Sequence, residues 1–180
     1  MKYTLSETET LDIGGVILHR VLYTDGTIGG WIESENNLSQ EGNAGVFDNA
    51  CVFGNARVFG DARVYDNARV CGNARVCGNA RVCDNARVSD NARVFGEAWV
   101  SDNARVRSNS DWLAVGPIGS RDAVTTIFRT DSGISVACGC FLGTLEQFEA
   151  KVAKTHGNNW HAQAYRAMIE MAKIRMGGAK

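Results

Sequence analysis

The sequence contains a single proline, Pro117, among its 180 residues, and it has no continuous apolar run of about 18 residues. Without such a run no membrane-spanning helix is predicted. The first eleven residues carry acids and threonines where a signal peptide needs an apolar stretch, so we expect a cytoplasmic protein. Six cysteines are present, and in that compartment reduced thiols are expected rather than a disulfide framework.

A strong charge of one sign is also lacking. The chain has 19 Lys and Arg against 20 Asp and Glu, a formal net charge of −1. The most basic segment, 43–108, has nine basic and seven acidic residues. No segment is basic enough to predict binding to duplex DNA, and the chain is not acidic enough to be a DNA mimic.

An uninterrupted array of eleven hexapeptides occupies residues 43–108, with NARVCG and NARVFG as typical units. Valine fills its position in every unit from Val46 to Val106, and alanine fills the position two residues earlier, from Ala44 to Ala104. A period of six with two inward positions two apart indicates a short strand followed by a turn. Gly-Asn, Asp-Asn and Gly-Asp pairs supply the turns, and Pro117 lies outside the array, as continuous ladder bonding requires.

This array resembles the hexapeptide-repeat family of left-handed parallel β-helices, in which three hexads make one triangular coil. Eleven hexads then give about 3.7 coils, roughly 18 Å of stack at ~4.8 Å per coil. Residues three hexads apart stack on one another, and residues one hexad apart lie on different faces. The predicted fold class is mainly β: an N-terminal β cap with an irregular first coil (1–42), a left-handed parallel β-helix (43–108), and a small α+β module with a β-hairpin and two helices (109–180).

Three outward columns of arginine follow from this geometry, interleaved with Phe, Tyr and Trp. Aromatic residues and Arg are enriched in interfaces, and the resemblance implies a homotrimer, so we expect these faces to form subunit contacts. The alternative is that each arginine is simply a solvated strand residue. The columns are Arg57, Arg75 and Arg93; Arg63 and Arg81, ending in Trp99; and Arg69, Arg87 and Arg105.

Two groups in the array invite a metal interpretation. Cys71, Cys77 and Cys83 are one hexad apart, so they fall on three separate faces and cannot share an ion within one chain. One corner carries aspartates spaced by three hexads, each followed by Asn, which form a carboxylate column. That column has the oxygen ligands for Ca²⁺ between coils, but Asp-Asn also makes good turns, and we prefer the turn interpretation. Its members are Asp48, Asp66, Asp84 and Asp102.

A solenoid needs caps at its ends. At the N-terminus, residues 2–5 and 15–23 are predicted strands with a turn at 24–27, and residues 29–33 and 37–39 form an irregular first coil, with Trp31 covering the end of the prism. At the C-terminus, strands are predicted at 112–115, 124–129 and 134–140, the last two joined by a turn at 130–133. A capping box, Thr144 to Gln147, begins a helix that ends near residue 155, and a second helix spans 160 to about 175.

The C-terminal module contains two candidate sites. Gly119, Ser120 and Arg121 end a glycine-rich turn that offers N–H groups and a guanidinium to an anion, with Arg129 as a further candidate; a plain structural loop is the alternative. The second set, with two thiols and two imidazoles, has the ligands of a closed zinc site, although buried thiols and loop histidines explain the pattern equally well. This set is Cys138, Cys140, His156 and His161.

Many hexapeptide-repeat proteins transfer acyl groups from coenzyme A or acyl carrier protein, with a histidine base at a subunit junction. Residues 43–108 contain no histidine; the three in the chain are His19, His156 and His161. We therefore expect no enzymatic activity and no cofactor. A coenzyme A-dependent acyltransferase is kept as an alternative.

A closer resemblance covers nearly the whole chain. The lead-in GGWIESENNLSQEGNA, the NARV array and the tail segments ACGCF and GTLEQFEAKV resemble phage and prophage hexapeptide-repeat proteins. This resemblance implies a non-catalytic binding protein that acts in the host cytoplasm. Its expected role is to antagonise a host defence system, either by binding a host protein or by sequestering a small nucleotide with Arg121, Arg129 or an arginine column. A structural virion component is the remaining alternative.

Overall fold

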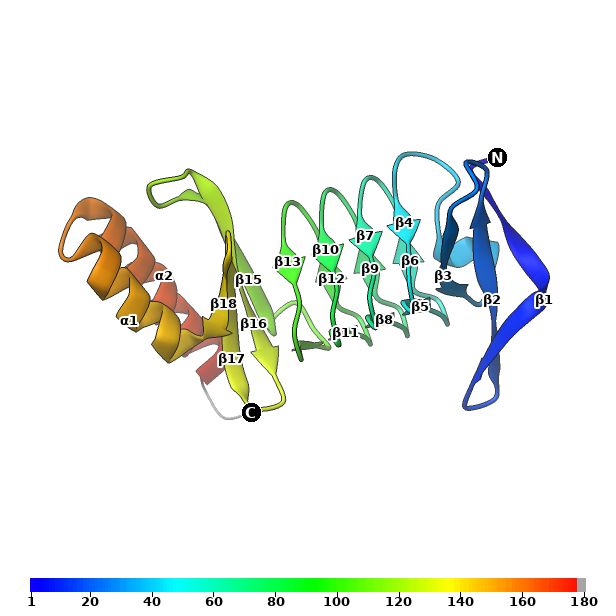
Figure 1. Cartoon of the computed structure of the whole chain (residues 1–180). Helices are drawn as coiled ribbons and strands as arrows, with labels where there is room; N and C mark the ends of the chain where they lie inside the picture. Colours follow the sequence, from blue (N-terminus) through cyan, green and yellow to red (C-terminus); the bar gives the residue numbers. More distant parts are fainter. Residues whose placement is uncertain (178–180) are drawn as a thin grey trace.

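The computed structural model describes residues 1–177, with a stack of coils between an N-terminal hairpin and a C-terminal sheet that carries two helices (Figure 1). Strands β1 (Tyr3–Ile13) and β2 (Val16–Tyr23) form the antiparallel hairpin, and β3 (Ile28–Ile32) pairs with β2. A short 3₁₀ turn, η1 (Glu35–Asn37), follows. No helix within residues 1–177 has the length and apolar character needed to cross a membrane.

Eleven two-residue strands, β4 to β14, build the stack, and each consists of one outward residue followed by one inward valine. Each pairs in parallel with the equivalent strand of a neighbouring coil, three hexads away along the chain, as Arg63 does with Arg81. The strands are β4 (Gly45–Val46), β5 (Cys51–Val52), β6 (Arg57–Val58), β7 (Arg63–Val64), β8 (Arg69–Val70), β9 (Arg75–Val76), β10 (Arg81–Val82), β11 (Arg87–Val88), β12 (Arg93–Val94), β13 (Trp99–Val100) and β14 (Arg105–Val106).

These strands form three sheets, ordered β1-β2-β3-β5-β8-β11-β14, β13-β10-β7-β4 and β12-β9-β6. We call their outer surfaces the seven-stranded face, the Trp99 face and the three-stranded face. The prediction of a parallel β-helix with three faces is confirmed, and so is the placement of Cys71, Cys77 and Cys83 after strands of different sheets. The left-handed sense of winding stays a prediction.

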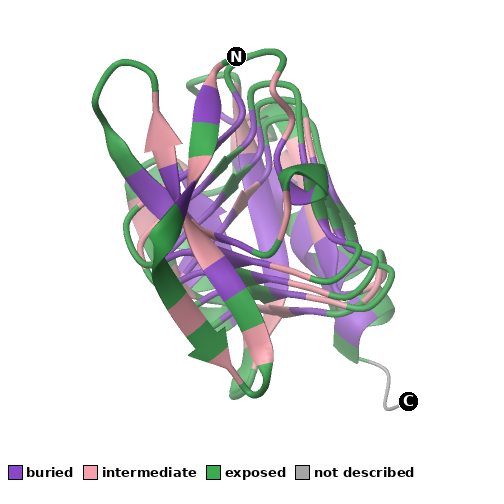
Figure 2. Ribbon diagram, turned by 90° about the vertical axis from the view of Figure 1, so that its right-hand side faces the viewer, coloured by how far each residue is buried: buried purple, intermediate pink, exposed green. Residues whose placement is uncertain are grey.

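The repeated valines and alanines fill the prism, and buried residues gather on the inner side of the coils (Figure 2). Every valine from Val46 to Val106 in the repeat is 0% exposed. Burying a valine side chain completely contributes about 1.5–3 kcal/mol to the free energy of unfolding. Corners use left-handed backbone, as at Gly78 (φ +65°), where an added Cβ would lie 3.0 Å from the Gly96 nitrogen of the next coil. Glycine fits this close approach, and at other corners an aspartate adopts the same left-handed backbone, as Asp84 does with a φ of +55°.

The first coil is longer than the others. Gly45 pairs with Arg63, exactly one period of three hexads further along the chain, whereas Trp31 pairs with Cys51 across a slightly longer segment. The Gln40 side chain in this longer coil bonds the backbone of Tyr3 through its amide (3.0 Å). The first coil therefore departs from the regular period of the stack.

Tyr3 covers the N-terminal end of the prism. Its side chain is 0% exposed, and its hydroxyl donates to the Leu38 carbonyl at 2.6 Å. The prediction that Trp31 covers this end is wrong, because strand alternation turns Ile32 inward and Trp31 outward. The Trp31 ring instead packs under the Arg20 guanidinium, 3.8 Å from the ring centroid.

The C-terminal module is a four-stranded antiparallel sheet with two helices on the face away from the stack (Figure 1). Its elements are β15 (Trp112–Ile118), β16 (Ala123–Thr130), β17 (Gly133–Cys138), β18 (Phe141–Thr144), α1 (Leu145–His156) and α2 (Trp160–Gly177). Trp112, Phe128 and Ala137 close the C-terminal end of the prism. The opposite face of the sheet packs on both helices through Ile127 and Val136.

The predicted strands, capping box and helices of this module are confirmed, with two corrections. The third strand ends at Cys138 rather than at 140, because Gly139 turns the chain with a φ of +60°. A fourth strand, β18, was not predicted; it pairs with β17 directly after this turn, with Cys138 opposite Phe141.

Candidate functional site: an arginine groove

Arginine side chains stand in register on the seven-stranded face. Arg69 pairs with Arg87, and Arg87 pairs with Arg105, on neighbouring coils. Each arginine precedes an inward valine, so strand alternation directs the guanidinium outward. The neighbouring outward position, one residue after each valine, carries Phe53, Cys71, Ser89 and Arg107.

A groove of about 420 Å³ runs along these two columns, and a second hollow of about 300 Å³ continues it toward the C-terminal sheet. We call the two together the arginine groove. Arg105, Arg107 and Asp131 line both parts, so the two hollows adjoin. The remaining charged lining residues are Arg69 and Arg87 in the first part, and Asp111 and Arg129 in the second.

Only two of the five arginines form ion pairs with described residues. Arg105 pairs with Asp131 at 2.6 Å, and Arg129 pairs with Asp111 at 3.3 Å. Asp111 is 8% exposed, and it also accepts the Arg107 N–H at 2.9 Å. Five arginines against two aspartates leave the groove three charges positive at neutral pH.

The two other faces carry the same repeat in different surroundings. Arg57, Arg75 and Arg93 stack in register on the three-stranded face, as predicted, with no ion pair to a described residue. On the Trp99 face, Arg63 stacks on Arg81. Trp99 ends that column. It contacts the C-terminal sheet of its own chain, where its backbone N–H donates to Thr126 Oγ1 at 2.9 Å. The expected subunit contacts of these faces remain a prediction.

The glycine-rich turn and Arg129 lie at opposite ends of β16. Arg129 belongs to the arginine groove, whereas Arg121 lies against Gly139, whose added Cβ would overlap the guanidinium. Gly119 is buried against the Tyr165 hydroxyl, and Ser120 is exposed. The structure therefore joins Arg129, but not Gly119, Ser120 or Arg121, to the arginine column.

The four zinc candidates are not brought together within the described part of the chain. Cys138 is buried, and its sulfur accepts a hydrogen bond from Thr125 Oγ1 at 3.1 Å. Cys140 lies beyond the end of β17 in an exposed turn, so the two thiols do not share one side of a strand. His156 and His161 lie near each other, with ring centroids 5.6 Å apart. A group of three ligand atoms within 4.8 Å occurs elsewhere in the described chain, at Asp66, Cys83 and Asp84.

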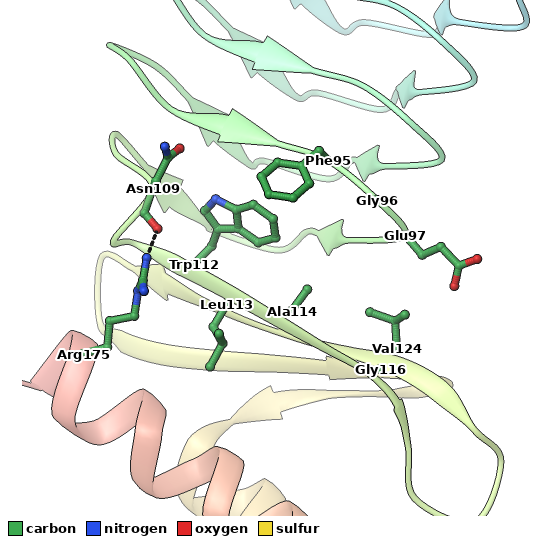
Figure 3. Close-up of a pocket in the computed structure, with 10 residues that line it drawn as sticks. All are labelled: Phe95, Gly96, Glu97, Asn109, Trp112, Leu113, Ala114, Gly116, Val124 and Arg175. Atoms are coloured by element: carbon green, nitrogen blue, oxygen red, sulfur yellow. Dashed lines mark hydrogen bonds between the residues drawn. The ribbon is translucent and has the colours of Figure 1, made fainter.

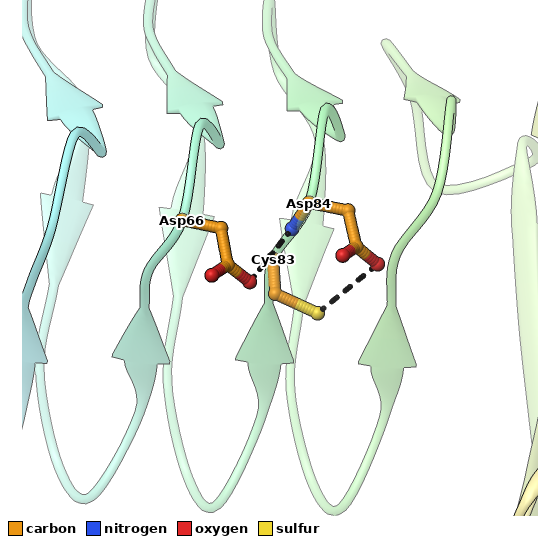
Figure 4. Close-up of side chains that lie close together, drawn as sticks. All are labelled: Asp66, Cys83 and Asp84. Atoms are coloured by element: carbon orange, nitrogen blue, oxygen red, sulfur yellow. Dashed lines mark hydrogen bonds between the residues drawn. The ribbon is translucent and has the colours of Figure 1, made fainter.

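Asp66 and Asp84 of this group belong to the predicted aspartate column, and Cys83 lies beside them (Figure 4). The Asp66 carboxylate accepts the Asp84 N–H at 3.3 Å, and the Asp84 carboxylate accepts the Asp102 N–H at 3.0 Å. All four aspartates of the column adopt left-handed backbone, with φ between 54° and 57°. Burial raises the pKa of the Cys83 thiol, so the metal-binding thiolate is disfavoured. These contacts support the turn-forming interpretation.

Sequence reasoning missed three charged residues of the arginine groove, namely Arg107, Asp111 and Asp131. Arg107 was visible in principle, because it lies one period of three hexads after Ser89 and so extends the same column. Asp131 had no such signal. It comes from the turn between β16 and β17, and its place beside Arg105 depends on how the C-terminal sheet packs on the stack.

Three windows of the stack, residues 62–78, 80–96 and 86–102, match the YdcK β-solenoid repeat. No curated protein matches the chain. Together with the observed register, the repeat match identifies the stack as a parallel β-solenoid of hexapeptide repeats.

Proposed function

We propose that the protein is a non-catalytic binding protein, with the β-solenoid as a rigid support and the arginine groove as its recognition surface. The observation that carries the proposal is the column of Arg69, Arg87 and Arg105, which lines a groove with a net charge of three positive. Stacked like charges repel one another, and a bound anion relieves that repulsion.

The ligand class is an anion with several negative groups. Arginine forms bidentate hydrogen bonds with carboxylate and phosphate, and Phe53 at one end of the groove offers an aromatic surface to an adjoining ring. A small nucleotide and an acidic surface of a host protein both have this chemistry. In line with the resemblance to phage proteins, the proposed role is antagonism of a host defence system in the host cytoplasm.

The proposal excludes catalysis at the groove. Residues 43–108 contain no histidine, and burial raises the pKa of the Cys71 thiol in the groove above its ordinary value. A protonated thiol is a poor nucleophile.

A homotrimer is part of the proposal, with subunit contacts on the Trp99 face. Analytical ultracentrifugation of the purified chain tests this part separately. A monomer at micromolar concentration would contradict it and would leave the binding proposal standing.

Capture from host lysate tests the binding function. The tagged full chain is incubated with lysate, and both the retained proteins and the retained small molecules are identified by mass spectrometry. The test variant is Arg69→Gln/Arg87→Gln. The matched control is Arg57→Gln/Arg75→Gln, which removes the same two charges from the same strand positions on the three-stranded face.

We expect the wild type and the control to retain the same ligand, and the test variant to retain at least about tenfold less, because each charge-assisted hydrogen bond contributes ~1.5–3 kcal/mol. Equal retention of the ligand by both variants would refute the arginine groove as the binding site. Retention of coenzyme A with histidine-dependent acyl transfer would instead establish the acyltransferase, and copurification with phage particles would establish the virion component.

A further inference from the structure

A second groove, of about 400 Å³, separates the last coil from the C-terminal sheet (Figure 3). Its origin lies in the register of the stack. Trp112 lies one period of three hexads after Val94, so a further coil would place it on the three-stranded sheet. Instead, β15 pairs with β16, and the sheet diverges from the last coil.

The walls of this groove are mainly apolar. Phe95 from the last coil is 53% exposed, and its ring meets that of Trp112 edge-on, with centroids 5.2 Å apart. Leu113, Ala114 and Val124 extend the apolar surface along the sheet. The volume lies within the range of pockets for small organic ligands.

Trp112 also brings an unsatisfied donor. The residue is 6% exposed, and its Nε1 has no hydrogen-bond partner among the described residues. Leaving a buried N–H unpaired is unfavourable, because its hydration is lost without a replacement hydrogen bond. Figure 3 shows Nε1 on the side of the ring that faces Asn109. An acceptor carried by a ligand at this end of the groove would remove that cost.

The two ends of the groove carry opposite charges, which would orient a charged ligand. At the Asn109 end, Arg175 donates to the Asn109 carbonyl at 2.6 Å and has no ion pair with a described residue. Asn109 is held in place because its side-chain oxygen accepts the Arg93 N–H at 2.8 Å. Glu97 lines the opposite end, as Figure 3 shows. A negative group is therefore attracted to Arg175 and repelled by Glu97.

We propose that this groove binds a small aromatic anion, with its ring against Phe95 and Trp112 and its negative group at Arg175. Aromatic rings pack edge-to-face or offset, which suits the exposed ring of Phe95. This site lies outside the arginine groove and shares no lining residue with it. Failure of one proposal therefore leaves the other intact.

Anilinonaphthalene sulfonate is a suitable probe, because it joins an aromatic body to a single negative group and becomes fluorescent in an apolar site. Titration of the full chain is compared with three variants. Arg175→Gln removes the anion contact, Ala114→Leu fills the groove, and Lys173→Gln is the matched control, since Lys173 lies on the same helix but pairs with Glu149. Circular dichroism establishes that each variant is folded.

We expect Arg175→Gln to raise the Kd at least about fivefold, Ala114→Leu to abolish the fluorescence gain, and Lys173→Gln to change the Kd less than about twofold. Equal effects of Arg175→Gln and Lys173→Gln, or full binding by a folded Ala114→Leu variant, would overturn the proposal.

A second measurement does not depend on the folding of any groove variant. The indole N–H resonances of the four tryptophans are followed in a ¹H–¹⁵N spectrum of the wild type as the probe is added. We expect the largest shift for Trp112. The largest shift at Trp160, which is 67% exposed on α2, would show that the probe binds the outer helix surface and would overturn the proposal.

Discussion

The three-stranded and seven-stranded faces carry the same Arg-Val strands in the same register, yet they differ in what surrounds the arginines. Arg57, Arg75 and Arg93 form a column without ion pairs to described residues. Arg69 and Arg87 belong to an equivalent column, but there Arg105 meets Asp131, and Arg107 and Arg129 extend the positive surface. The repeat therefore supplies the charge on both faces, and on the seven-stranded face the C-terminal module adds the charged residues that complete the arginine groove.

The largest expected effect comes from a substitution in the valine core, because unfolding of the stack would destroy both faces. Val82→Asp places a carboxylate in the prism, where Val82 is 0% exposed and where none of the buried residues between 1 and 177 is basic. We expect a loss of about 4 kcal/mol or more in the free energy of unfolding, measured by urea denaturation. Arg81→Ser, at the adjacent exposed position, should change it by less than about 1 kcal/mol. Similar losses in both variants would contradict this account of the core.

The next largest effect is a difference in anion binding between variants of the two arginine columns. With inorganic triphosphate as the probe, isothermal titration calorimetry of Arg69→Gln/Arg87→Gln should show a Kd raised by about tenfold or more. Arg57→Gln/Arg75→Gln should change the Kd by less than about twofold, because Arg107 and Arg129 line the groove beside the other column. A larger effect on the three-stranded face would move the anion site there.

A smaller effect sharpens the role of the ion pair. Asp131→Asn releases Arg105 and raises the net charge of the groove, so triphosphate should bind about threefold tighter at low salt. Asp122→Asn changes the same charge in the same module outside the groove, and it should leave the Kd unchanged. Weaker binding by Asp131→Asn would mean that Asp131 orders Arg105 for the ligand rather than competing with it.

The smallest effect is a difference in thiol reactivity between equivalent positions. Burial raises the pKa of both Cys71, in the arginine groove, and Cys77, on the three-stranded face. The thiolate is the reactive form, so alkylation of both should be slow at pH 7 and should still increase above pH 9. Triphosphate should slow alkylation of Cys71 and leave Cys77 unaffected, as measured by peptide mass spectrometry. Equal protection of both thiols would contradict binding in the groove.

The period of three hexads predicted the three faces, their arginine columns and the separation of the cysteines from the sequence alone, because one period fixes the position of every residue in the stack. The same period could have placed Arg107 in the column of Ser89. The contact of Asp131 with Arg105 could not be predicted, since it depends on tertiary packing between a periodic and an aperiodic segment. The zinc interpretation assumed that Cys138 and Cys140 share a strand, and the turn at Gly139 removes that assumption.

The parallel register of the coils has a consequence for how such a chain changes length. Adding three hexads inserts one whole coil and returns the C-terminal module to the same angular position. Adding a single hexad rotates that module by a third of a turn, so Asp131 would meet a different arginine column and the groove would form on another face. Only the addition or removal of three hexads at a time preserves the arginine groove. The number of hexads therefore decides which face of the solenoid the C-terminal module completes.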